Sequence, residues 1–269
     1  MQGLEITTVA GCGINCTYCP QNSFLQKYKS SVKTLTFENF KQAICKIPTT
    51  TRIHFTGFSE PFFNKDCFKM AEFSRARGNY IKISTTLYKA SPQNISTITT
   101  GLYDEIILHL PVDDQAMHLR MDDVYLQNIE TCTKSLRPID AIVFFGNKPH
   151  SLIKKHLLDK TKARVIFLKQ DNRNWNSRAG HLNYGPINHT NHNKIKCSLN
   201  KIEQNVMLPN GDIYLCCMDW GLDHKIGNLF TDTYEDIINS SSYKNILLSL
   251  SNNKSGTLCW RCDHARPDE

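Results

Sequence analysis

Hydrophobic and polar positions follow two alternating periods along the first 169 residues. Short runs rich in β-branched and aromatic residues indicate strands at 4–10, 52–57, 80–86, 105–112, 141–146 and 163–169. Segments with helical spacing of apolar residues separate several of these runs, at 37–47, 67–78, 122–136 and 150–158. Repeated β-α units form a parallel sheet flanked by helices, so the pattern predicts an α/β fold, a partial (β/α)6 barrel. Ligands of such folds bind at the carboxyl ends of the strands.

The pattern changes after residue 169. Residues 170–196 lose their periodicity and are rich in Asn, Gly and His, which predicts a linker. Residues 205–217 form two apolar runs around Pro-Asn-Gly-Asp, which predicts a β-hairpin through Asn210 and Gly211, and a helix is expected at 233–249. We therefore predict a barrel at 1–169, a linker at 170–196 and a small hairpin-plus-helix domain at 197–269.

The composition is that of a globular protein. The chain has 269 residues, of which 40% are hydrophobic and 21% charged, and this excludes intrinsic disorder. No apolar run reaches the ~18 residues of a membrane span, and the N-terminus lacks the features of a secretory signal, so we expect a cytoplasmic protein with no membrane partner. Because cytoplasmic thiols stay reduced, the eleven cysteines are expected to be ligands, nucleophiles or packing residues.

The formal charge of +7 is unevenly distributed. Residues 198–269 hold 6 Lys and Arg against 10 Asp and Glu, so the positive excess lies before them. A basic stretch contains Lys160, Lys162, Arg164, Lys169, Arg173, Arg178, Lys194 and Lys196 with the single acid Asp171. Such a stretch can attract a phosphate or carboxylate, or it can be a solvated linker. It lacks the interleaved aromatic residues that stack on bases, so nucleic-acid binding is not favoured.

Three cysteines, Cys12, Cys16 and Cys19, follow the first predicted strand within eight residues, and we call them the cysteine triad. Three thiolates in such a short loop can converge on one inorganic centre. A structural zinc site takes four protein ligands, and no fourth Cys or His lies nearby in the sequence. An iron–sulfur cluster held by three cysteines leaves one iron open to another ligand, so the spacing favours a cluster.

The C-x3-C-x2-C spacing, with the aromatic Tyr18 before the third cysteine, resembles the signature of the radical S-adenosylmethionine (radical SAM) enzymes. The segment Gly57-Phe58-Ser59-Glu60-Pro61 ends the second strand and resembles the glycine–glutamate segment of that family, which receives the methionyl amino group. Ser84 and Thr85 end the third strand and resemble the family's Thr-Asn-Gly ribose contact, with Thr86 and Leu87 in place of Asn and Gly.

The resemblance implies that the triad holds a [4Fe-4S] cluster whose fourth iron is chelated by SAM, and that reductive cleavage of SAM gives a 5′-deoxyadenosyl radical. It implies that Glu60 binds the ammonium of SAM, that Gly57 permits close backbone approach and that Tyr18 packs against the adenine. A flavodoxin- or ferredoxin-type protein would supply the electron. Arg178, just past the sixth strand, is expected to clamp an anion of SAM or substrate, or to form a linker salt bridge.

A second group of cysteines comprises Cys197, the adjacent Cys216 and Cys217, and the C-x2-C of Cys259 and Cys262. Four thiolates can close a tetrahedral site, so zinc and iron–sulfur are both chemically allowed. The hairpin, the Ile226–Leu229 segment and the terminal C-x2-C resemble the SPASM/Twitch extension of radical SAM enzymes. The number of cysteines fits the Twitch form with one auxiliary [4Fe-4S] cluster, so the resemblance implies two [4Fe-4S] clusters in the chain.

The adjacent pair divides into two roles, because neighbouring strand residues point to opposite faces. The resemblance favours Cys216 as the ligand beside Cys197, Cys259 and Cys262. Cys217 then faces away as a packing residue or lies near the cavity as a hydrogen-atom donor. The remaining cysteines, Cys45, Cys67 and Cys132, lie in helical segments and are expected to pack in the core.

The resemblance implies a radical SAM enzyme acting on a small polar metabolite, such as a sugar, an aminocyclitol or a nucleotide-like compound, with an anionic one allowed. The size and single auxiliary cluster are similar to the Twitch dehydrogenases of aminoglycoside biosynthesis, which favours a two-electron oxidation with the auxiliary cluster as electron acceptor. The alternatives are an epimerase, a peptide-modifying enzyme and, from another class, a non-catalytic iron–sulfur or zinc sensor. The sequence does not identify the substrate, because the residues that contact it are dispersed in loops.

Overall fold

The computed structural model describes residues 2–113, 116–154, 161–168, 177–183, 192–251 and 256–268. Parts of the predicted 150–158 helix and of the 170–196 linker lie outside these ranges, as do Lys160, Lys169 and Arg173 of the basic stretch. The basic residues Lys194 and Lys196 both pair with Asp268, at 2.5 and 3.1 Å. The end of the basic stretch therefore forms surface ion pairs.

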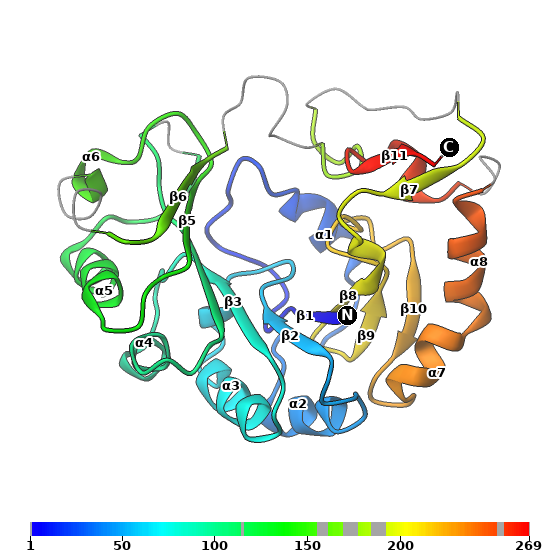
Figure 1. Ribbon diagram of the computed structural model, residues 1–269, viewed down its shortest axis with the longest axis horizontal. Coiled ribbons are helices and arrows are strands. Elements are labelled where there is room, and N and C mark those ends of the chain that lie inside the picture. Colours follow the sequence, from blue (N-terminus) through cyan, green and yellow to red (C-terminus); the bar gives the residue numbers. More distant parts are fainter. Residues whose placement is uncertain are drawn as a thin grey trace.

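Six parallel strands make up the barrel part of the sheet (Figure 1). They are β1 (Gly3–Ile6), β2 (Arg52–Phe55), β3 (Ile81–Thr85), β4 (Glu105–His109), β5 (Ala141–Phe144) and β6 (Arg164–Phe167). Each strand pairs in parallel with its predecessor along the chain. All six match a run that the sequence predicts, so the partial barrel is confirmed.

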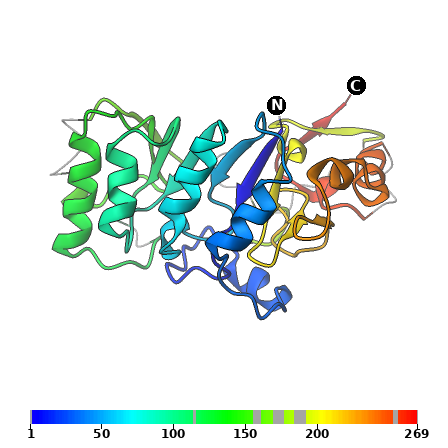
Figure 2. The same ribbon diagram turned by 90° about the horizontal axis from the view of Figure 1, so that it is seen from below.

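Helices cover the outer side of this curved sheet (Figure 1). They are α2 (Phe37–Ile44), α3 (Cys67–Ala76), α4 (Pro92–Thr99), α5 (Asp123–Lys134) and α6 (Ser151–Ile153), with the short η1 (Pro61–Phe63) before α3. Helix α1 (Gln21–Lys27) lies apart from them, where its Phe24 packs with Phe58 and Trp220. Figure 2 shows helices of this set side by side along one face of the molecule. Hydroxyl or carboxylate N-caps start three of them, namely Thr36, Ser91 and Asp122. Helix α4 is absent from the prediction because its sequence is polar and holds only two large apolar residues, Ile95 and Ile98.

The C-terminal part extends the same sheet. Its elements are β7 (Ile195–Cys197), η3 (Lys201–Glu203), β8 (Gln204–Met207), β9 (Asp212–Tyr214), β10 (Lys225–Asn228), α7 (Tyr234–Asn239), α8 (Ser241–Ser249), η5 (Leu258–Arg261) and β11 (Ala265–Pro267). Strand β8 pairs in parallel with β1, while β8, β9 and β10 form an antiparallel meander. Strands β7 and β11 make a separate two-stranded sheet. One nine-stranded sheet therefore joins the predicted barrel to the predicted C-terminal unit.

The sequence predicts two local features of the C-terminal part, a hairpin and a helix, and the structure tests both. The predicted hairpin is present as β8 and β9, and Gly211 turns it at φ +81°, with a Cβ there only 2.6 Å from the Phe230 ring. The predicted 233–249 helix is instead two helices, because Ser240 has ψ 153° and its hydroxyl caps α8. None of the described helices is long and apolar enough to cross a membrane.

Candidate active site

A cavity of about 340 Å³ opens at the carboxyl ends of the barrel strands. Loops that follow β1, β2 and β3 line it, together with the ends of β4 and β5 and parts of the C-terminal unit. All the predicted cofactor-binding residues except Pro61 lie in its wall, and so does the whole cysteine triad: Cys12, Cys16, Tyr18, Cys19, Gly57, Phe58, Ser59, Glu60, Ser84, Thr85 and Arg178. Segments distant in sequence thus meet at the edge where ligands of parallel sheets bind.

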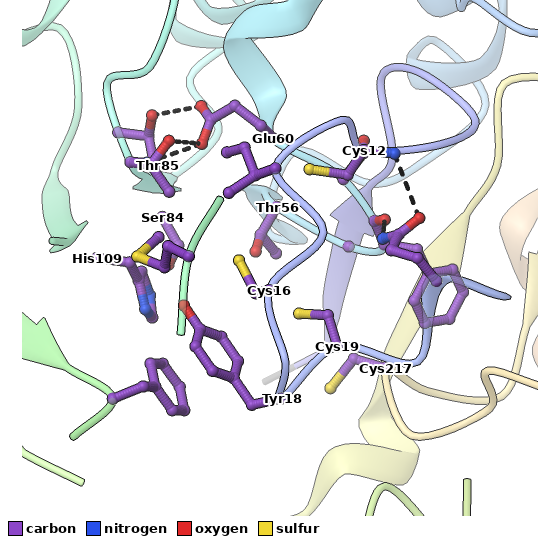
Figure 3. A pocket seen from close by; sticks show the side chains of 18 of the residues that line it. Cys12, Cys16, Tyr18, Cys19, Thr56, Glu60, Ser84, Thr85, His109 and Cys217 are labelled. Atoms are coloured by element: carbon purple, nitrogen blue, oxygen red, sulfur yellow. Dashed lines mark hydrogen bonds between the residues drawn. The ribbon is translucent and has the colours of Figure 1, made fainter. Parts of the chain in front are cut away.

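The cysteine triad lies in the loop between β1 and α1, with its sulfurs directed into one space (Figure 3). The backbone N–H of Cys19 donates to the carbonyl of Cys16 at 3.0 Å, which tightens the loop. Gln21 fixes the loop from the side, since its Oε1 accepts from the N–H of Cys12 and its Nε2 donates to the carbonyl of Phe58 at 2.6 Å. The triad and the Gly57–Pro61 segment are therefore held together by one buried side chain.

The triad fits a cluster better than a single metal ion. No three His, Cys, Asp or Glu side chains in the described ranges are placed to hold one ion. A single zinc needs all its ligand atoms within about 2.0–2.3 Å of one point, whereas cysteines bind the separate irons of a [4Fe-4S] cluster. Burial raises the pKa of Cys12 to about 11, and a hydrogen bond from Cys16 lowers the pKa of Cys19. Metal binding would have to displace these thiol protons.

Glu60 lies buried beside β3 and already has several hydrogen-bond donors. Thr86 donates to Oε2 through both its N–H and its hydroxyl at 2.7 Å, and the Thr85 hydroxyl donates to Oε1 at 2.5 Å. The N–H of Phe62 adds a fourth bond at 3.2 Å. Burial raises the pKa of Glu60. A carboxylate has about four acceptor sites, so an ammonium group would have to share or replace one of these donors, and the role of Glu60 toward SAM stays a prediction.

The close packing of Thr7 against residue 57 requires a glycine at this position. Its φ is +74°, and a Cβ would lie 2.2 Å from Oγ1 of Thr7. That hydroxyl accepts from the N–H of Phe58 at 3.1 Å, so the glycine lets the β2 loop close onto β1. Close packing inside the protein therefore explains this glycine without a ligand.

Two buried polar groups in the cavity wall have no hydrogen-bond partner among the described residues. They are the hydroxyl of Ser59 and the indole N–H of Trp220. Buried polar groups are normally satisfied, so each indicates a polar partner absent from the protein chain itself. A polar cofactor such as SAM fits this donor and acceptor set.

Three stacked rings form another part of the wall. Tyr18 stacks on Phe145 at 4.0 Å between centroids, and Phe145 stacks on His109 at 5.6 Å. One face of Tyr18 is thus covered by protein, which leaves the other for the expected adenine contact. Phe58 packs against Trp220 at 4.6 Å, and the Pro61 carbonyl accepts from Thr8, so these two residues serve mainly to build the loop.

Arg178 reaches the cavity from a turn that the C-terminal end holds in place. Arg178 and Ala179 both have positive φ, at 52° and 54°. Asp263 accepts from the N–H and hydroxyl of Ser177 at 2.8 and 2.9 Å and from the N–H of Ala179 at 3.4 Å. Two successive left-handed residues are costly and persist only where the surroundings fix them. The charge of Arg178 acts on Tyr18 and Cys19, at the triad end of the cavity.

The second group of cysteines surrounds a small separate cavity. Cys197, Cys216, Cys259 and Cys262 all line it, as the sequence predicts for the auxiliary ligands. Burial raises the pKa of Cys259 to about 12 and that of Cys262 to about 11. Pairing of β7 with β11 sets Cys197 opposite Ala265, three residues after Cys262. Four thiols from three segments of the chain thus line one small cavity.

Cys217 lies on the other side, in the wall of the large cavity (Figure 3). Of the two positions expected for it, the structure favours the one near the cavity over packing alone. Among the remaining cysteines, Cys67 and Cys132 are buried as expected, but Cys45 is exposed. Cys45 follows the last residue of α2 as its C-cap, where the chain leaves the core.

The sequence did not single out several polar residues of the large cavity. Glu5, His54 and His109 point into it from β1, β2 and β4, and Lys201 reaches it from η3. Each of the three strand residues is a polar position inside an otherwise apolar run, which is the signal that could have found them.

The comparisons with known proteins agree with this geometry. A sequence model of the SPASM family, described as an iron-sulfur cluster-binding domain, matches residues 197–263. No curated protein matches the chain in sequence.

Several solved structures are similar over nearly the whole chain. BtrN in complex with AdoMet and 2-DOIA is 15% identical at a TM-score of 0.64, covering 99% of this chain and 93% of that one. Native anSMEcpe with bound AdoMet is 14% identical at a TM-score of 0.60, covering 97% and 88%. Streptococcus suis SuiB bound to the precursor peptide SuiA is 14% identical at a TM-score of 0.62, covering 97% and 69%. All three are radical SAM enzymes, so the chain has the radical SAM fold, and its residues 197–263 match the SPASM family.

Proposed function

We propose that the protein is a radical SAM enzyme that abstracts hydrogen from a small polar substrate. The observation that carries this proposal is the convergence of the cysteine triad, the Gly57–Pro61 segment and the Ser84–Thr85 strand end on one cavity. These three motifs come from three separate segments of the chain, so their meeting at one cavity is not expected by chance. The expected reductant is a flavodoxin- or ferredoxin-type protein.

The triad would hold one [4Fe-4S] cluster with SAM on its open iron, and together they would supply the 5′-deoxyadenosyl radical. The chain's own residues would orient the cofactor. Ser59 and Trp220 offer polar groups that lack protein partners, and Tyr18, backed by Phe145, offers a flat apolar face. Arg178 offers a guanidinium for a carboxylate at the triad end.

The second group of cysteines would hold an auxiliary [4Fe-4S] cluster through Cys197, Cys216, Cys259 and Cys262. The match of residues 197–263 to an iron-sulfur cluster-binding family supports this. Four cysteine ligands, one for each iron, would leave no iron open to substrate. Electron transfer or structural support is then the role of this second cluster.

Iron and SAM cleavage test both assignments. Anaerobically reconstituted protein should contain about eight iron per chain, and dithionite with SAM should release 5′-deoxyadenosine. Replacing the whole triad by Ala should leave about four iron per chain and no 5′-deoxyadenosine. The exposed Cys45 provides the matched control, since Cys45→Ala removes a thiol from neither group. Zinc in place of iron, or cleavage of SAM by the triad variant, would overturn the proposal in favour of a metal-binding sensor or another SAM site.

The nature of the substrate is the finer part of the proposal. We favour a small polar metabolite, such as a sugar, an aminocyclitol or a nucleotide-like compound, because the cavity is compact and lined by polar strand residues. The similar BtrN structure contains the small ligand 2-DOIA, which supports this choice, whereas the SuiB structure with a precursor peptide supports the alternative of peptide modification. Resemblance to the Twitch dehydrogenases favours a two-electron oxidation.

One observation favours a second type of reaction, epimerisation: the Cys217 thiol lies in the cavity wall. A thiol there could return hydrogen to the opposite face of the substrate carbon, which is an epimerisation. The sulfur would lose one hydrogen atom and would need one electron and one proton to recover, with the external reductant as the electron source. Burial and the charge of nearby Glu5 raise the pKa of Cys217 to about 12, and Glu5 is a group able to pass that proton.

Deuterated water distinguishes the two outcomes. An epimerised product keeps its composition and carries one solvent deuterium at the inverted carbon, whereas an oxidised product is two hydrogens lighter. Cys217→Ala should abolish the first reaction and preserve the second. Solvent deuterium in a product of unchanged composition would refute oxidation, and a product two hydrogens lighter would refute epimerisation.

A further inference from the structure

Five polar side chains in the large cavity belong to neither the triad nor the Gly57–Pro61 segment. They come from consecutive parallel strands and from η3, and we call them the polar wall: Glu5, His54, Ser84, His109 and Lys201. Glu5 of β1 stands beside His54 of β2 in the sheet register. Neighbours in register project to the same face, so the wall is one continuous surface built on rigid strands.

The wall is organised in hydrogen-bonded pairs. Lys201 Nζ lies 3.4 Å from Glu5 Oε1 and 2.9 Å from Gln204 Oε1. His54 Nε2 and Ser84 Oγ are 2.8 Å apart. The side chain of Glu5 is only 5% exposed and that of Lys201 25%. A buried carboxylate and a buried ammonium therefore offer their remaining acceptor and donor positions to the cavity.

The wall carries no net charge. Glu5 and Lys201 cancel, and burial lowers the pKa of His54 and brings that of His109 to about 4, so both imidazoles are neutral near pH 7. Two further charged residues of these strands, Lys82 of β3 and Glu105 of β4, form an ion pair at 2.8 Å, so their charges also cancel. Arg178 is the remaining cation of the described cavity wall. Its charge acts on Cys19 at the triad end, where the SAM carboxylate is expected, and also on His109 and Cys217.

Neutral paired donors and acceptors select a particular ligand chemistry. A hydroxyl group both donates and accepts, so each hydroxyl can bridge one pair, such as Glu5 with Lys201. A neutral imidazole also has one donor and one acceptor nitrogen. An anion bound here would face Glu5, and a cation would face Lys201, each at the cost of an imperfectly paired buried charge.

We propose, on the basis of the function above, that the polar wall is the substrate-recognition surface and that its ligand is a small uncharged polyhydroxylated ring, a sugar or a cyclitol. The ring would lie across β1 to β4 with its hydroxyls on the wall. The Cys217 thiol lines the same cavity as Glu5 and would then border the same ring. Phosphorylated, carboxylated or aminated rings would bind more weakly.

The test is binding to the reconstituted protein with SAM and without reductant, by calorimetry and saturation-transfer NMR. The probes are myo-inositol, glucose, glucosamine, glucuronate and glucose 6-phosphate. The neutral probes should bind at least about tenfold more tightly than each charged one. Tighter binding of any charged probe, or no binding of the neutral probes at millimolar concentration, would overturn the proposal.

Two variants give the polar wall a net charge, one negative and one positive, and so provide a second test. Lys201→Met leaves Glu5 alone and should shift the preference toward glucosamine, whereas Glu5→Gln leaves Lys201 alone and should shift it toward glucuronate. Glu38→Gln, which alters an exposed carboxylate in an ion pair with Lys41, is the matched control and should leave the order unchanged. Unchanged preferences in both wall variants would also overturn the proposal, and the wild-type probe series remains decisive if a variant fails to fold.

The binding and SAM-cleavage measurements together distinguish a failure of this inference from a failure of the proposed function. Cleavage of SAM by protein that prefers charged probes would overturn only the substrate class. Neutral probes binding to a protein that holds iron but never cleaves SAM would overturn the radical chemistry and leave the wall as a polyol site.

Discussion

Replacing Gly57 by alanine tests whether this glycine serves the fold or the cofactor. The backbone has φ +74° at Gly57, and a Cβ would lie 2.2 Å from Oγ1 and 3.1 Å from the backbone nitrogen of Thr7. Thr7 lies just past the end of β1 and cannot retreat without moving the strand, because its N–H donates to the carbonyl of Met207 at 2.9 Å. Gly57→Ala must therefore displace the β2 loop and break the bond from Phe58 N–H to Thr7.

The size of the effect follows from these contacts. A left-handed conformation costs an alanine roughly 1–2 kcal/mol, and the lost buried hydrogen bond costs about 1 kcal/mol more. We expect Gly57→Ala to lower the free energy of unfolding by about 3 kcal/mol, and the midpoint of thermal unfolding by about 6–9 °C for a chain of this size.

Gly78→Ala is the matched control. Gly78 has φ +87°, and no atom lies within 4 Å of its Cβ position, so this variant bears the backbone cost alone, about 1 kcal/mol. Both variants would be reconstituted anaerobically and unfolded with circular dichroism as the readout. Equal losses in the two variants would refute the steric reasoning. A Gly57→Ala protein of wild-type stability that fails only to bind SAM would establish the close-approach role that the resemblance implies.

Three further outcomes are expected. Cys216→Ala should lose about half of the iron while Cys217→Ala keeps all of it, measured by iron and sulfide content, and the reverse pattern would exchange their roles. Asp263→Ala removes the acceptor that fixes the turn carrying Arg178 and should lower stability by about 2 kcal/mol and speed tryptic cleavage after Arg178 several-fold; unchanged cleavage would show that the turn is held by other contacts. His109 should titrate near pH 4 by NMR because burial lowers its pKa to about 4. Its neutral form is favoured in the folded state, so stability is full above pH 6.5 and falls toward pH 4, and a His109→Phe variant should lose that slope.

The strands and the triad were predictable because their signals are local. Each strand is a short apolar run, and the three cysteines fall within one loop. Helix α4 shows the limit of this approach, since Ile95 and Ile98 alone give too weak a helical period. The break at Ser240 was also missed, because a serine inside a helical pattern carries no clear stop signal until its capping bond is seen.

The polar wall could not be assembled from the sequence. Glu5, His54 and His109 lie on three different strands, and only the parallel register brings them to one face. A polar residue within an apolar run marks each position, but it does not say whether the side chain meets solvent, a partner or a ligand. For Glu60 the sequence indicated a site residue, and the structure adds that Thr85 and Thr86 already donate to it.

Cys216 and Cys217 do face different cavities, but they lie in the turn after β9 (Asp212–Tyr214), so the predicted strand alternation is not the reason. Strand β8 pairs with β1, so the hairpin extends the barrel sheet and carries one thiol to each cavity. Of the two positions expected for Cys217, packing and the cavity, this pairing leads to the second.

The pairing of β8 with β1 also connects the cysteine triad and the second group of cysteines through one sheet. Lys201 lines both cavities: its backbone N–H donates to Sγ of Cys197 at 3.3 Å, and its ammonium pairs with Glu5. Any shift of Cys197 must therefore move the lysine that completes the polar wall. Without residues 197–263, β1 would be an edge strand paired only with β2, and the large cavity would lose Lys201, Cys217 and Trp220. The C-terminal unit thus completes the wall of the large cavity, and this gives its position beside the barrel a structural reason that does not depend on the proposed electron transfer.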